Sequence, residues 1–161
     1  MVGEGFCPYA SLPYRDGRVE IVTSPESTLR ESVAALASLI ARLRREPEIE
    51  TALLIFPGGW IGYLAYLDLY DAAQTALETL DEEGDFTLAP FHPDFEFGEL
   101  PPGDIAHWIH RAPYPTLHVL RTASIEQAVG FDADTSHVTR RNGAHAAKLG
   151  EAFFRKFLTD R

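Results

Sequence analysis

Hydrophobic and polar positions follow two different spacings along this chain, one typical of strands and one typical of helices. Residues 18–23 alternate between apolar and polar side chains, which predicts a strand with one covered face. Residues 51–56 form a continuous apolar run, which predicts a central strand covered on both faces. We predict a third strand at residues 86–91 and a fourth at residues 116–121.

Between these strands, apolar residues recur at the spacing of an amphipathic helix. One helix is predicted from Ser24-Pro25, with Ser24 as its N-cap, to Glu46-Pro47. Others are predicted at residues 60–80, 104–111 and 124–129, and a last one carries Leu149, Phe153 and Phe157 on one face. Strands alternating with helices predict a single α/β domain over residues 1–161, a sandwich with a mixed sheet of about four strands flanked by helices.

Composition and charge exclude several classes of partner. Acidic residues outnumber basic ones by 24 to 14, and the net charge of −10 argues against nucleic acid and acidic membrane surfaces. No apolar run approaches the roughly 18 residues of a membrane span. With one cysteine, the chain can form neither an intramolecular disulfide nor a Cys₄ or Cys₂His₂ zinc site. We therefore expect a cytoplasmic protein with a small-molecule substrate, and the sequence leaves a homodimer open.

Residues 86–121 concentrate the side chains best suited to chemistry. Six prolines in this segment disfavour long helices and central strands, and an ordered connection of this kind is usually functional. The segment also holds four of the six histidines of the chain, His92, His107, His110 and His118. It is therefore where we expect the functional site.

The four histidines of this segment suggest a metal site. His107 and His110 are three residues apart, so both imidazoles leave the same face of a helical turn and could share one ion. We expect all four rings to converge at the sheet edge, where with Asp94 or Glu96 they would suit Zn, Fe or Cu. The alternative is that the histidines are separate and bond to backbone or lie at the surface.

Four further residues are candidates for the same site. Cys7 is a candidate nucleophile or thiolate ligand, with a small buried apolar side chain as the alternative. Arg111 and Arg121 are candidates for binding a carboxylate or phosphate. Tyr114, together with the neighbouring aromatics, is a candidate for a pocket wall, although most buried aromatics belong to the core.

Long motifs in the chain resemble a bacterial family catalogued as domain of unknown function 1415. They are Gly5-Phe6-Cys7-Pro8-Tyr9-Ala10, Phe91-His92-Pro93-Asp94-Phe95-Glu96-Phe97, the run from His110 to Arg121, and Arg141-Asn142. The resemblance spans nearly the whole chain and implies a fold and a site but no reaction. In the family, amides stand where this chain has His107 and His110, which identifies it as a divergent member. We interpret the two imidazoles as gained ligands or acid–base groups.

These observations predict a small cytoplasmic enzyme that acts on a small anionic or polar metabolite, assisted by a transition metal or haem. The expected catalytic residues are Cys7, His92, Arg111, Tyr114 and His118. The expected cofactor-binding residues are His107, His110, Trp108 and Arg121, and the expected metal ligands are His92, His107, His110 and His118. The alternatives are a non-catalytic protein that binds metal, haem or a small molecule, and an acidic interaction module.

Overall fold

A mixed four-stranded sheet forms the centre of the protein in the computed structural model, which describes residues 3–7, 10–81, 84–129 and 136–158. The strands are β1 (Val19–Thr23), β2 (Thr51–Ile55), β3 (Phe86–Phe91) and β4 (Thr116–Arg121). Their order in the sheet is β1-β2-β4-β3, with β1 parallel to β2 and β4 antiparallel to both of its neighbours. The predicted mixed sheet with flanking helices is confirmed.

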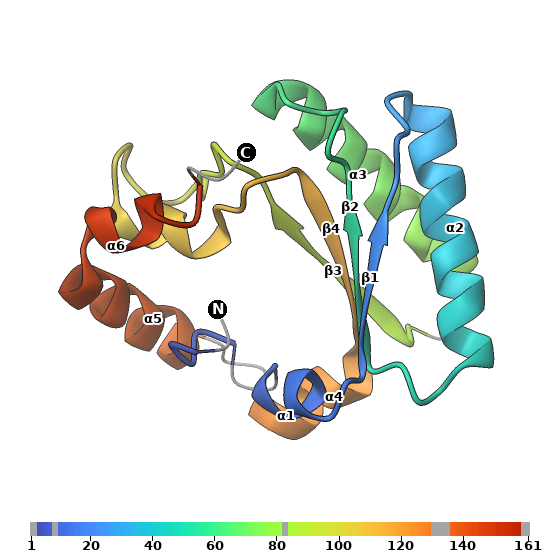
Figure 1. The fold of residues 1–161 in the computed structure, drawn as a ribbon, viewed down its shortest axis with the longest axis horizontal. Coiled ribbons are helices and arrows are strands. Elements are labelled where there is room, and N and C mark those ends of the chain that lie inside the picture. The colour runs from blue at the N-terminus through green and yellow to red at the C-terminus, as the bar shows by residue number, and fades with distance from the viewer. Residues whose placement is uncertain (1–2, 8–9, 82–83, 130–135, 159–161) are drawn as a thin grey trace.

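Helices lie on both sides of this sheet (Figure 1). On one side are the two long helices, α2 (Leu29–Arg45) and α3 (Tyr63–Leu80). The other side carries the short 3₁₀ helix η1 (Ile105–His110) with α5 (Ser136–Leu149) and α6 (Glu151–Arg155). The remaining helices are α1 (Ser11–Arg15) and α4 (Thr122–Val129). None of the helices among the described residues is long and apolar enough to cross a membrane.

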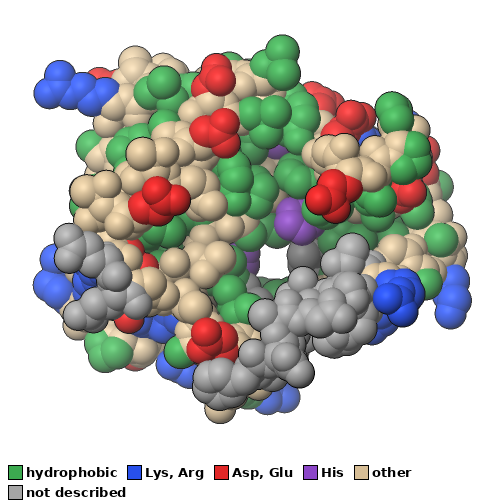
Figure 2. All heavy atoms as spheres, turned by 180° about the vertical axis from the view of Figure 1, so that it is seen from behind, with side chains coloured by type: hydrophobic (Ala, Val, Ile, Leu, Met, Phe, Trp, Pro, Cys, Tyr) green, Lys and Arg blue, Asp and Glu red, His purple; other side chains and the backbone are tan. Residues whose placement is uncertain are grey.

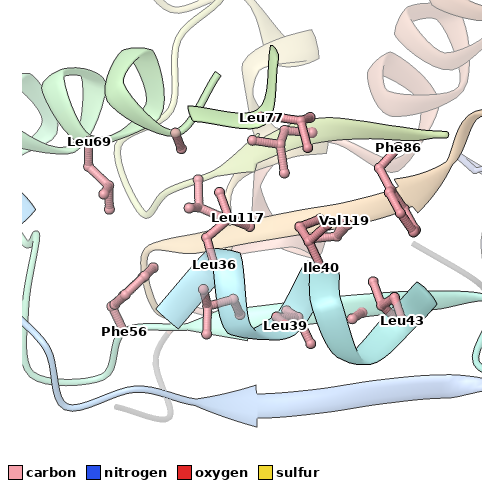
Figure 3. Packing of buried hydrophobic residues seen from close by; sticks show 14 of the residues in the cluster. Leu36, Leu39, Ile40, Leu43, Phe56, Leu69, Leu77, Phe86, Leu117 and Val119 are labelled. Atoms are coloured by element: carbon pink, nitrogen blue, oxygen red, sulfur yellow. The ribbon is translucent and has the colours of Figure 1, made fainter. Parts of the chain in front are cut away.

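The main hydrophobic core lies between the sheet and the two long helices (Figure 3). Leu36 and Ile40 of α2 contribute to it, as do Leu54 of β2 and Leu117 of β4, and all four are at most 1% exposed. Each fully buried side chain of this size contributes about 1.5–3 kcal/mol to folding through the hydrophobic effect. This core fixes the position of the sheet from one side.

Several predicted helix boundaries differ from the structure, among them the start of α4, which is Thr122 and not Ser124. The N-cap of α2 is Thr28, whose hydroxyl accepts from the Glu31 N–H, whereas Ser24 accepts from Glu26 in the preceding turn. The α3 helix begins only at Tyr63, after a turn in which Trp60 has a positive φ of 60°. At the C-terminal end, Gly150 has a φ of 73° and divides the predicted last helix into α5 and α6.

A second, smaller apolar cluster holds the other layer together. It consists of Phe6, Ala106, Trp108, Ile109, Ala146 and Phe154, which come from the N-terminal segment, η1, α5 and α6. This cluster is distinct from the main core. The sheet has one face packed against α2 and α3 in the main core. Its other face, called the second face below, is turned toward this smaller cluster.

Candidate functional site

The second face of the sheet carries the pocket-facing residues of all four strands. Register places Ile21, Leu53, His118 and Ala89 side by side in one row across the sheet. Side chains alternate between faces along a strand, so Leu117 and Val119, on either side of His118, point into the main core instead. His118 is thus the imidazole at the middle of an otherwise apolar row.

A pocket of about 800 Å³ lies over this face of the sheet. Its floor includes Leu53, Ile55 and His118, and its opposite wall includes Phe6, Ile109 and Asn142. Figure 2 shows the hollow from behind the view of Figure 1, with histidine at its edge. A concave site of this size, mainly apolar with a few polar groups, is typical of small-molecule binding.

Hydrogen bonds define the protonation of the His118 ring. Its Nε2 lies 2.7 Å from Thr51 Oγ1, and that hydroxyl donates its one hydrogen to the Val119 carbonyl at 2.7 Å. Nε2 is therefore assigned as the donor to Thr51, and Nδ1 of the neutral ring carries the lone pair. Burial, reinforced by the neighbouring His110, lowers the pKa of His118 to about 4. His118 is thus neutral at physiological pH.

His110 is the second imidazole in the pocket wall. Its Nδ1 donates to the Pro90 carbonyl at 2.9 Å, which leaves the lone pair on Nε2. The ring stacks on Phe91, with 4.8 Å between centroids, and also contacts Phe95 and Phe97. Burial lowers the pKa of His110 from its ordinary value. Two neutral imidazoles therefore line one pocket.

His92 and His107 do not join them, so the predicted convergence of four histidines is wrong. Neither lines the pocket. The His92 ring accepts from the Asp94 N–H and donates to the Trp60 carbonyl, and it packs against Tyr63 and Tyr66 on the α3 side of the sheet. The His107 ring accepts from the Phe97 N–H and donates to the Pro101 carbonyl.

The predicted four-histidine metal site is consequently not formed. Both ring nitrogens of His92 and of His107 are occupied by backbone groups, so neither ring offers a lone pair to a metal. Among the described residues, no group of three or more His, Cys, Asp or Glu side chains is arranged to hold a metal ion.

Arg111, Trp108 and Arg121 also lie outside the pocket. The Arg111 guanidinium covers the Trp108 ring at 4.5 Å and donates to the Phe95 carbonyl. Trp108 is buried in the second apolar cluster. Arg121 donates to the Leu43 and Glu46 carbonyls at the C-terminal end of α2, where a cation is favourable. In the structure these residues stabilise the fold and do not reach a ligand in the pocket.

Cys7 and Tyr114, by contrast, line the same pocket as the two imidazoles. Cys7 is a free, partly exposed thiol. Its neighbours Pro8 and Tyr9 lie outside the described residues. Tyr114 lies between the main pocket and a smaller cavity lined by Ile61 and by prolines of three loops. Of the nine predicted site residues, the structure thus brings together Cys7, His110, Tyr114 and His118.

Thr51 and Asn142 are among the pocket residues that the sequence analysis did not predict. Thr51 appears in the sequence as part of an apolar strand, and only the register of β2 against β4 places it beside His118. Asn142 is buried and donates to the Phe6 carbonyl at 2.7 Å, while Arg141 donates to the Gly5 carbonyl. The Arg-Asn pair was visible as a motif, but its partner is 136 residues away.

Comparisons with known proteins agree with the motifs. No curated protein and no solved structure was found to match the chain. A family model described as protein of unknown function (DUF1415) matches residues 1–156. The chain therefore belongs to the DUF1415 family.

Proposed function

We propose that this protein is an enzyme that acts on a small molecule held in the pocket over the second face of the sheet. One observation carries the proposal: His110 and His118 line the same pocket, and each has one ring nitrogen bonded to the protein and the other without a partner among the described residues. Such an arrangement orients an imidazole and leaves its lone pair for a ligand.

Proton transfer is the chemistry that these two rings support best. A neutral imidazole accepts a proton from a substrate when the two atoms are within hydrogen-bond reach. Thr51 holds the tautomer of His118 and Pro90 holds that of His110, so each ring is already oriented before a substrate binds. In this scheme His118 and His110 are the acid–base residues and Thr51 is a positioning residue.

The described lining of the pocket disfavours an anionic substrate. Both arginines expected to bind an anion are engaged elsewhere in the fold, Arg111 over Trp108 and Arg121 at the end of α2. None of the described residues that line the pocket is Lys or Arg. Transferring an unpaired anion into an apolar site would cost several kcal/mol.

The alternative is a non-catalytic protein that binds a small molecule in the same pocket, and the predominantly apolar lining favours it. Haem remains a variant of either proposal, with His110, His118 or Cys7 as the axial ligand. The absorption spectrum and elemental analysis of protein purified without chelator test haem and metal together. A cytoplasmic location and a homodimer belong to the proposal as well, tested by cell fractionation and light scattering.

Comparative metabolite profiling tests the enzyme proposal. Purified protein is incubated with a bacterial small-molecule extract, and mass spectrometry follows which compounds decrease and which appear. We expect turnover that His118→Gln and His110→Gln each reduce by about 10²-fold or more, as is typical for loss of an acid–base group. Binding without turnover would support the alternative.

A variant that fills the pocket tests whether the ligand binds there. Ala89 is the neighbour of His118 on β3, so Ala89→Phe fills the pocket without removing an imidazole. The same change at exposed Ala41 of α2 adds a phenyl ring away from the pocket. We expect Ala89→Phe to abolish ligand binding and Ala41→Phe to preserve it. Equal binding by both variants would place the ligand elsewhere.

A further inference from the structure

We infer that the ligand of this pocket is an uncharged, largely apolar molecule that donates hydrogen bonds, through a hydroxyl or N–H group, to the imidazoles of His118 and His110. This inference rests on the proposed function and specifies its ligand. The buried polar groups of the floor and the opposite wall, and the absence of charged side chains among the described lining residues, support it.

The polar groups on the floor of the pocket are acceptors. The Thr51 hydroxyl donates to the Val119 carbonyl, and the Thr116 hydroxyl donates to the Tyr114 carbonyl. The ring hydrogen of His118 points to Thr51, and that of His110 points to Pro90. The lone pairs of the two imidazoles therefore remain for the ligand, and only a hydrogen-bond donor satisfies them.

Asn142 in the opposite wall bonds to the protein through both polar atoms of its amide. Its amide nitrogen donates to the Phe6 carbonyl, and its amide oxygen accepts from the Arg141 guanidinium at 2.9 Å. Each of its polar atoms therefore has a partner in the protein before a ligand binds. The imidazole pair supplies the lone pairs on the floor, and the hydroxyls of Tyr14 and Tyr114 with the Cys7 thiol are the other polar groups of the lining.

The described part of the lining offers no counter-charge to a ligand of either sign. None of the described lining residues is Asp, Glu, Lys or Arg, and both histidines are held neutral. Side chains such as Leu53, Ile109 and Phe91 form most of the surface instead. A charged group would lose its hydration there without compensation, whereas an apolar body would gain from burial.

Four naphthalene probes that differ in one substituent test the inference. They are 2-naphthol, 2-methoxynaphthalene, 2-naphthoate and 2-naphthylmethylammonium, each titrated by calorimetry at pH 7.5. We expect 2-naphthol to bind roughly three- to tenfold more tightly than its methyl ether, the usual effect of one hydrogen bond. The two charged probes should bind at least tenfold more weakly than 2-naphthol.

Replacing His118 measures how much its hydrogen bond contributes to the preference for naphthol over the ether. In His118→Phe, which keeps a flat ring of similar size, the preference for naphthol over the ether should fall below twofold while the ether still binds. Thr87→Val is the matched control, because Thr87 lies on the same sheet outside the pocket lining and bonds to Thr122 of α4. This control should keep the full preference.

Histidine ¹⁵N spectra of the unmutated protein give a second readout that needs no variant. Naphthol should shift the resonance of the unprotonated nitrogen of His118, and the ether should not. Tighter binding of the ether or of either charged probe would overturn the inference and leave the pocket as a binding site. If none of the four probes binds, the inference is overturned, whereas the proposed function is decided separately by the metabolite profiling.

Discussion

The Nε2 atom of His118 lies 2.7 Å from the hydroxyl oxygen of Thr51, and this contact joins β4 to β2 on the floor of the pocket. The same hydroxyl donates to the Val119 carbonyl, so it links the ring to the backbone of its own strand. His118 is consequently held in one orientation and one tautomer. Its surroundings also penalise the charged form of the ring, which has a measurable consequence for stability.

Stability should fall as the pH decreases through the range in which His118 resists protonation. The pKa of His118 is lowered to about 4 in the folded protein, against an ordinary 6.5. Between these values the unfolded chain binds a proton that the folded chain does not, so His118 contributes stability above about pH 6.5 that is lost as the pH falls toward 4. His110, whose pKa is also lowered, acts in the same direction.

Urea unfolding at pH 7.5 and pH 5 measures this effect. Linkage predicts that the His118 contribution to the free energy of unfolding is smaller by roughly 2 kcal/mol at pH 5. Carboxylates also contribute to the total change, so the comparison is with His118→Phe, in which the loss between the two pH values should be smaller by about that amount. An identical pH dependence in the variant would mean that His118 titrates normally in the folded state.

Separate substitutions of His107 and His110 should affect different properties, the first mainly stability and the second mainly ligand binding. His107→Asn removes a buried ring that bonds to Phe97 N–H and to the Pro101 carbonyl, and each partner left unpaired costs about 1–3 kcal/mol. His110→Asn should change stability less and ligand binding more, because His110 lines the pocket. The histidine spacing alone predicts instead that replacing both His107 and His110 with Asn leaves the fold intact and removes a bound metal.

Denaturant titration and ligand titration of the two single variants distinguish these predictions. We expect His107→Asn to lower the midpoint of unfolding while the folded fraction still binds ligand. His110→Asn should lower affinity with little change of midpoint. A stable His107→Asn protein that no longer binds ligand would show instead that His107 contributes to the binding site.

The Asn142–Phe6 hydrogen bond should stabilise the packing of the N-terminal segment against α5 at the pocket wall. Asn142→Ala leaves the buried Phe6 carbonyl without this donor, which should cost about 1–3 kcal/mol and increase proteolysis before residue 10. Arg140→Ala, at the exposed neighbouring position on α5, is the control and should change neither. Limited proteolysis followed by mass spectrometry locates the cleavage, and equal rates in both variants would contradict the prediction.

Local patterns in the sequence were sufficient to predict most elements of the fold. The bounds predicted for β3 and β4 agree with the structure, because a proline-rich segment and clear turns delimit both strands. Strand order was not predictable from these patterns, since the pairing of β2 with β4 joins residues about 67 positions apart. The α1 helix and the division of the last helix at Gly150 were also missed.

The sequence prediction placed the site in a segment that does contribute to the pocket, but only His110 and His118 of its four histidines line it. Periodicity places His107 and His110 on one short helix, yet it cannot show that the loop from Phe97 to Pro101 folds back to occupy both nitrogens of His107. Nor does it show that His92 lies on the α3 side of the sheet. Only tertiary structure decides which imidazoles keep a lone pair for a ligand.

The placement of Cys7 supports a last prediction, on the reactivity of its thiol. Cys7 is partly exposed and lines the pocket, so iodoacetamide should alkylate it in the folded protein at pH 7.5. A ligand that occupies the pocket should slow the reaction at least fivefold, whereas Ala89→Phe should make the rate insensitive to ligand. Mass spectrometry over time measures the rate without interference, because Cys7 is the only cysteine of the chain. A rate that ligand does not alter would show that the thiol is reached from outside the pocket, and it would separate Cys7 from the site of His110 and His118.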